Sequence, residues 1–112
     1  MKSYTDLSQS RKLAEILPLK SADMFWYLAT KGNPVAGFNE GYNEYGDFEL
    51  PCWSLAALLN VLEHPRCFQG GRPTYWFCGC SGKDKLYHEV EADNPVDACY
   101  EMILKLHELK LL

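Results

Sequence analysis

The residues best suited to chemistry are two cysteines two positions apart, Cys78 and Cys80, followed by His88. Cysteines at this spacing on a β-strand point to the same face. Two thiolates and an imidazole from the facing strand are ligand types that Zn²⁺ takes in proteins. The three residues therefore form a candidate metal site, and the two thiols are also a candidate for redox chemistry.

The register of the expected hairpin decides whether these side chains meet. A two-residue turn over residues 82–83 is favoured, because glycine suits its first position. That turn places Cys80 opposite Lys85, with both cysteines on the face opposite to His88. A loop one residue longer brings them together, since a shift of one residue moves every side chain to the other face. The favoured turn thus predicts that the cysteines and His88 do not converge. If the side chains do converge, the alternative function is that of a small metal- or thiol-dependent protein that uses Cys78, Cys80 and His88.

A second candidate is an acidic segment, residues 38–48, in which aromatic side chains alternate with Gly, Asn and Glu. Tyr-rich loops of this composition make adaptable contact surfaces at a low cost in entropy. The segment does not have the spacing of a calcium-binding loop. It predicts either a protein-binding loop or aromatic residues that fold back onto the core. The candidate partner-binding residues are Phe38, Tyr42, Tyr45 and Phe48.

The charge distribution argues against a nucleic-acid partner. The net charge is −4, whereas nucleic-acid binders gain much of their affinity from clustered basic residues. No basic residue occurs between Lys31 and Arg66. Nucleophilic catalysis needs a nucleophile, a base and an orienting group, and no spacing in the chain links such residues. The sequence favours a non-catalytic protein without a cofactor, acting through protein–protein binding.

Length and composition are those of one globular domain spanning residues 1–112, with 47% hydrophobic and 23% charged residues. No run approaches the roughly 20 apolar residues that span a bilayer, so no membrane contact is expected. The five cysteines are an odd number. In a chain without an export signal they indicate reduced thiols and a cytoplasmic location.

Periodicity and capping residues predict three helices, from about 6 to 17, from about 52 to 62 and from Pro95 onward. Thr5 or Asp6 can cap the first helix, and Asn94 is the expected cap of the last. Strands are expected over residues 24–29, 74–80 and 85–91. Residues 32–49 are expected to form a loop, with or without a short strand at either end. The fold class is therefore α+β, with three helices packed on a small, mainly antiparallel sheet in the order α-β-α-β-β-α. The apolar surface of the last helix is wide, which makes a homo-oligomer through this C-terminal helix possible. Its stripe comprises Cys99, Met102, Ile103, Leu106 and Leu109, and Leu104, Leu111 and Leu112 lie off this stripe.

Two stretches resemble segments of known small proteins. Residues 50–59, LPCWSLAALL, resemble a Pro-x-Trp/Tyr-x-Leu-x-x-Leu-Leu segment. Residues 91–99, EADNPVDAC, resemble an Ala-Asp-Thr/Asn-Pro-x-Asp-Ala segment that opens a last helix. Both occur in this order in small uncharacterised proteins of phages, prophages and conjugative elements of gut bacteria. The resemblance covers the chain from the second helix onward. It implies a bacterial cytoplasmic setting and a mobile-element origin, and it assigns no reaction and no site residue.

Overall fold

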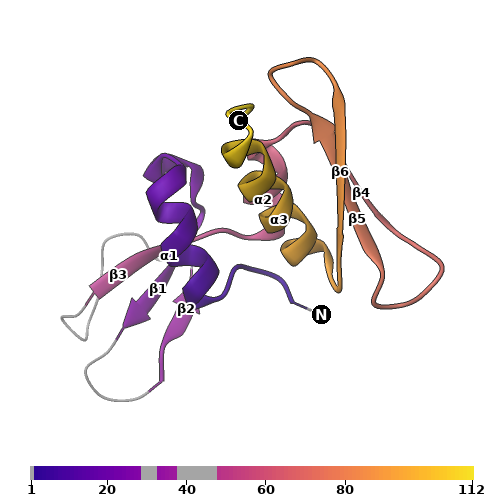
Figure 1. The fold of residues 1–112 in the computed structure, drawn as a ribbon. Coiled ribbons are helices and arrows are strands. Elements are labelled where there is room, and N and C mark those ends of the chain that lie inside the picture. The colour runs from indigo at the N-terminus through magenta and orange to yellow at the C-terminus, as the bar shows by residue number, and fades with distance from the viewer. Residues whose placement is uncertain (1, 29–32, 38–47) are drawn as a thin grey trace.

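The computed structural model describes residues 2–28, 33–37 and 48–112 (Figure 1). This part of the chain forms three α-helices and two three-stranded antiparallel sheets. The α+β class is confirmed, but the order is α-β-β-β-α-β-β-β-α rather than α-β-α-β-β-α. No described helix has the length and apolar character needed to cross a bilayer. The elements are α1 (Leu7–Ile16), the 3₁₀ turn η1 (Leu19–Ser21), β1 (Met24–Leu28), β2 (Val35–Gly37), β3 (Phe48–Cys52), α2 (Leu55–Val61), β4 (Glu63–Gln69), β5 (Trp76–Ser81), β6 (Tyr87–Ala92) and α3 (Pro95–Glu108).

The first sheet has the strand order β2-β1-β3, and α1 packs against it (Figure 1). Asp6 caps α1 through a complete capping box with Gln9, which satisfies two backbone donors at the helix start. The helix ends before Pro18, as expected. The segment 32–49, expected to be a loop with or without a short strand at either end, contains β2 and the start of β3, and both strands pair with β1.

The second sheet has the order β4-β5-β6 and includes a strand that the sequence did not predict. The second helix was expected to reach residue 62, yet α2 ends at Val61 and β4 begins at Glu63. His64 adopts a left-handed backbone conformation with φ 50°. His64 is the second residue of β4, just after the end of α2. The chain passes directly from α2 into β4, and β4 then pairs along β5, from Glu63 opposite Ser81 to Gln69 opposite Trp76.

The two sheets lie on opposite sides of a central helical layer that contains α2 and α3 (Figure 1). Asn94 caps α3 and Pro95 occupies its first turn, as predicted. Residues of α1, α2, β5 and α3 share one hydrophobic cluster. The apolar stripe of α3 is mostly buried inside the chain, with only Leu109 largely exposed. A homo-oligomer through this helix stays a prediction. The buried members of the stripe are Cys99, Met102, Ile103 and Leu106.

The hairpin between β5 and β6 differs from the favoured two-residue turn. Its last strand pair is Ser81 opposite Tyr87, so five residues form the connection. Asp84 accepts a hydrogen bond from the Leu86 N–H, and Lys85 takes a left-handed conformation with φ 65°. The Lys83 N–H donates to the Leu111 carbonyl at 3.0 Å. This tertiary contact with the C-terminal segment holds the longer loop, and local turn preferences could not reveal it.

Candidate functional site

The longer loop places Cys80 directly opposite His88, so the two cysteines and the histidine share one face of the sheet. The prediction that they lie on opposite faces is therefore wrong. They still do not form a metal site. The His88 ring is paired with Asp84, 3.1 Å from its carboxylate, and both thiols are fully buried. Among the residues that the structure describes, no group of three or more His, Cys, Asp or Glu side chains is arranged to hold a metal ion.

The Cys78 thiol instead faces two other cysteines. It lies opposite Cys67 of β4, and the Cys99 thiol of α3 is close enough to interact with both. Contact with Cys78 and burial raise the pKa of Cys99, and burial raises the pKa of Cys67. Burial likewise raises the pKa of Cys80 to about 11. A raised pKa leaves little of the reactive thiolate at neutral pH, whereas the hydrogen bond with Cys99 lowers the pKa of Cys78. Cys78, Cys80 and Cys99 are all fully buried, so they act as core residues.

This burial predicts how the thiols react. In the native protein we expect only Cys67, which is half-buried, to react with Ellman's reagent, and to react slowly because its pKa is raised. All five should react in denaturant, because unfolding exposes them. The absorbance of the released thionitrobenzoate measures the number of reactive thiols in the native and in the unfolded protein. A Cys67→Ser variant should lose the native reaction, and rapid reaction of several thiols in the folded variant would contradict the packing.

The predicted partner-binding segment lies mostly outside the described residues, including Phe38, Tyr42 and Tyr45. Phe48 is the first residue of β3, and its backbone pairs with Leu28 of β1. Partner binding by these four aromatic residues stays a prediction.

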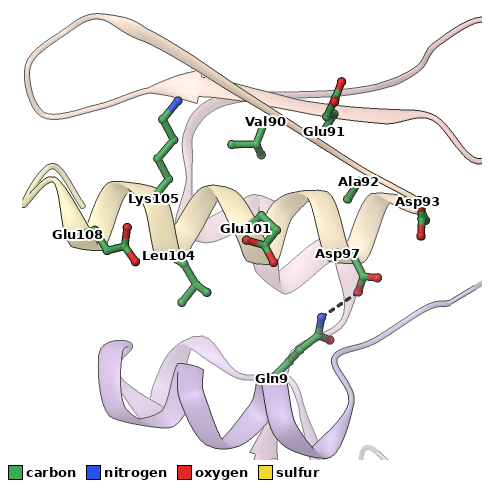
Figure 2. A pocket seen from close by; sticks show the side chains of 10 residues that line it. All are labelled: Gln9, Val90, Glu91, Ala92, Asp93, Asp97, Glu101, Leu104, Lys105 and Glu108. Carbon is green, nitrogen blue, oxygen red and sulfur yellow. Dashed lines mark hydrogen bonds between the residues drawn. The ribbon is translucent and has the colours of Figure 1, made fainter.

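A groove of about 520 Å³ runs along α3, between β6 and α1 (Figure 2). Its volume is in the range of pockets that bind small molecules or peptide side chains. Val90, Ala92 and Leu104 supply apolar surface to its wall. Charged side chains of α3 border this surface. The lining residues are Gln9, Val90, Glu91, Ala92, Asp93, Asp97, Glu101, Leu104, Lys105 and Glu108.

The charge of the groove is mostly negative. The Glu91 side chain points away from α3, because it lies on the outer side of β6 (Figure 2). Asp93, Glu101 and Glu108 form no ion pair within the described part of the chain, while Asp97 is paired. Lys105 is the one basic residue of the lining. We name this surface the acidic groove.

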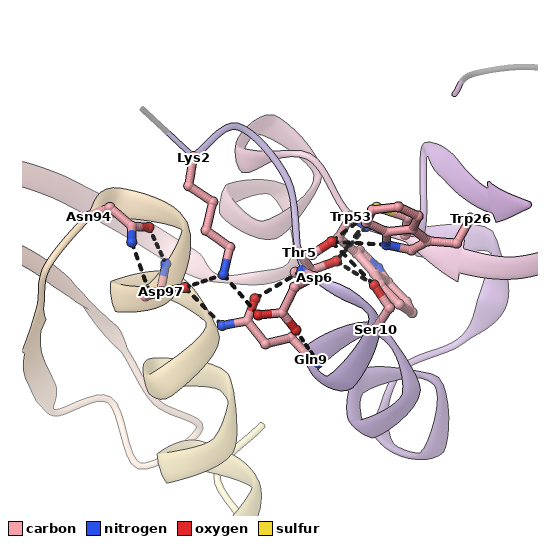
Figure 3. Close-up of polar contacts among 10 residues, drawn as sticks. Lys2, Thr5, Asp6, Gln9, Ser10, Trp26, Trp53, Asn94 and Asp97 are labelled. Carbon is pink, nitrogen blue, oxygen red and sulfur yellow. Dashed lines mark hydrogen bonds and ion pairs between the residues drawn. The ribbon is translucent and has the colours of Figure 1, made fainter. Parts of the chain in front are cut away.

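Asp97 closes one end of the acidic groove by joining α3 to the N-terminal segment (Figure 3). Its carboxylate lies 2.7 Å from Lys2 Nζ and accepts a hydrogen bond from Gln9 Nε2 at 2.8 Å. Asn94 Nδ2 donates to its second oxygen at 2.8 Å. Burial alone would raise the pKa of Asp97, but these hydrogen bonds outweigh burial and hold the pKa below its usual value. Asp97 is therefore ionised and fully engaged inside the protein.

The comparisons with known proteins assign no family. No protein-family model matches the chain, and neither a curated protein nor a solved structure is significantly similar to it. The role of each surface therefore has to follow from its own chemistry.

Sequence reasoning missed the acidic groove because its residues come from three elements. The helical spacing of Glu101, Leu104 and Glu108 places these residues along one side of α3 and is readable from the sequence. Their opposition to Val90 and Ala92 depends on the docking of β6 against α3, which no local pattern encodes.

Proposed function

We propose that the protein is a non-catalytic binding protein that holds a basic, amphipathic segment of a protein partner in the acidic groove. A mobile-element accessory role is part of this proposal, and it rests on the resemblance of the two sequence stretches. The observation that supports binding is the combination of apolar wall and unpaired carboxylates along one helix.

The chemistry of the groove selects the kind of occupant. Glu101 and Glu108 are exposed on α3, with the half-buried Leu104 between them. An apolar side chain of the partner can cover Leu104, while lysine or arginine side chains reach the flanking carboxylates. Helices that dock in grooves use this alternation of anchors and charges. An acidic segment would be repelled, because only Lys105 offers it a partner charge.

Binding of synthetic peptides to the purified chain tests the proposal. Fluorescence anisotropy should detect a labelled amphipathic Lys/Leu peptide and should detect no binding of its Glu/Leu counterpart. Charge reversal by Glu101→Lys or Glu108→Lys should each weaken binding about fivefold, corresponding to roughly 1 kcal/mol for an exposed ion pair. Salt should weaken binding as well, because exposed charges are screened.

Glu15→Lys is the matched control, since it makes the same change of net charge at an exposed site on α1 that does not line the groove. It should leave the affinity nearly unchanged. If Glu15→Lys weakened binding as much as Glu101→Lys, the attraction would depend on the net charge of the protein and not on the groove. Equal binding of both peptides would reject the proposal.

A further inference from the structure

The outer face of the second sheet, which points away from α3, carries aromatic rings where a surface sheet usually carries polar side chains. Alternation along the strands separates the two faces. Cys78, Cys80 and Val90 point inward to the core. The residues of opposite parity form the outer face: Arg66, Phe68, Tyr75, Phe77, Tyr87, Glu89 and Glu91.

The rings of the outer face lie close to the sheet and to each other. Phe68 of β4 stacks on Phe77 of β5, with ring centroids 5.0 Å apart and planes 15° apart. Tyr75 meets Phe77 edge to face at 4.7 Å. The Tyr87 phenol covers Gly79 and leaves no room for a Cβ atom at this position. The glycine therefore allows the ring to lie on the strand, and a layer of rings runs along β5.

Arg66 and Glu89, which carry opposite charges, lie on either side of this row of rings at the same position along the strands. Arg66 of β4 pairs with Gly79 of β5, and Gly79 pairs with Glu89 of β6. One edge of the face therefore carries Arg66, beside a Glu63 that is paired with Lys85, and the other edge carries Glu89 and Glu91, with the rings between them. Arg66, Glu89 and Tyr87 are exposed, as is Phe68 at 41%.

We propose that the outer face binds a second copy of this chain around a two-fold axis parallel to β5. Such an axis places β4 of one copy over β6 of the other, so that Arg66 of each copy faces Glu89 of its partner. The rings of the two β5 rows meet at the centre. A two-fold axis across the strands would place β4 over β4 and oppose like charges, which is unfavourable. The charge pattern thus selects one of the two isologous arrangements.

The small size of the face indicates a weak dimer. Strands about 4.8 Å apart, with about 3.3 Å per residue, give an area of roughly 300 Å² for each copy. The total of roughly 600 Å² is below the range of stable complexes, so we expect a dissociation constant on the order of 100 µM. This inference is independent of the acidic groove, which lies on the other side of β6.

Sedimentation velocity from about 10 µM to about 1 mM, a range that brackets this constant, tests the proposal with the intact chain. The wild type should shift from monomer to dimer. Arg66→Glu and Glu89→Arg should each remain monomeric alone, because each opposes like charges twice. An equimolar mixture of the two variants should form a dimer again, since every facing pair then has opposite charges. Lys12→Glu on α1 is the control and should dimerise like the wild type.

Phe68→Ala gives a second readout and should weaken the dimer about tenfold, because aromatic anchors dominate interfaces. Thermal unfolding of each variant at low concentration verifies folding. A wild type that stays monomeric at every concentration overturns the proposal, as does a mixture that stays monomeric. A monomer that bound oligothymidine through Phe68 and Tyr87 would also overturn it and make the face a stacking platform for single strands.

Discussion

Replacement of Trp53 by alanine is expected to lower the free energy of unfolding by about 3–5 kcal/mol, a range typical of a deleted core aromatic. Trp53 is fully buried and belongs to the hydrophobic cluster. Its backbone exchanges hydrogen bonds with Thr5 (Figure 3). Its indole Nε1 donates to Ser21 Oγ at 3.0 Å. Truncation therefore leaves a cavity at the junction of β3, α2 and the N-terminal segment. Urea unfolding followed by circular dichroism measures the loss.

Two further variants separate the causes of this loss. Trp53→Phe keeps most of the ring volume but removes the donor to Ser21, so it should cost about 1–2 kcal/mol. Leu86→Ala removes a side chain that is 63% exposed, and it should change stability by less than about 0.5 kcal/mol. Equal losses for Trp53→Ala and Leu86→Ala would show that the core described around Trp53 is not formed in solution.

Replacement of Asp97 by alanine should give the second large effect, a loss of about 1–3 kcal/mol. The carboxylate accepts from Lys2, Gln9 and Asn94, and it places a negative charge in the first turn of α3. Its removal leaves these donors without their acceptor and detaches the N-terminal segment from α3. Asp97→Asn retains the shape and should cost less, because the side chain is 31% exposed and water screens part of the charge.

The contribution of Asp97 should also depend on pH in a defined direction. Its folded-state pKa lies below the unfolded value of about 3.9. The carboxylate therefore adds stability above the unfolded pKa, and this stability disappears as the pH falls through the folded pKa. The stability difference between wild type and Asp97→Asn should be constant near neutrality and shrink below about pH 4. A difference that grew on acidification would contradict the assigned hydrogen bonds.

Local sequence signals predicted the helix starts well. Asp6 and Asn94 cap α1 and α3 as expected, because their short polar side chains satisfy free backbone N–H groups within the same segment. The buried stripe of α3 was equally readable, since helical periodicity requires no knowledge of the partner surface. These predictions depend only on residues within about one or two helical turns of each other.

The strands and the candidate sites depended on contacts between distant segments. β4 was missed because a strand is stabilised by its neighbour, and the pairing of Cys67 with Cys78 joins two separate elements. The predicted hairpin register was wrong because the Leu111 carbonyl accepts a hydrogen bond from Lys83 in the turn and stabilises a longer loop. That contact shifts every side chain of β6 to the face opposite to the predicted one.

The sequence by itself determined the α+β class, the three helices, their caps and the apolar side of the last helix. Only the tertiary structure decided that the chain builds two sheets, that Cys78 and Cys80 are core residues, and that α3 is covered on its apolar side. It also created the acidic groove and the outer face of the second sheet. The physical reason is that capping and periodicity act within one segment, whereas registers, grooves and sheet faces arise from the packing of segments that the sequence keeps apart.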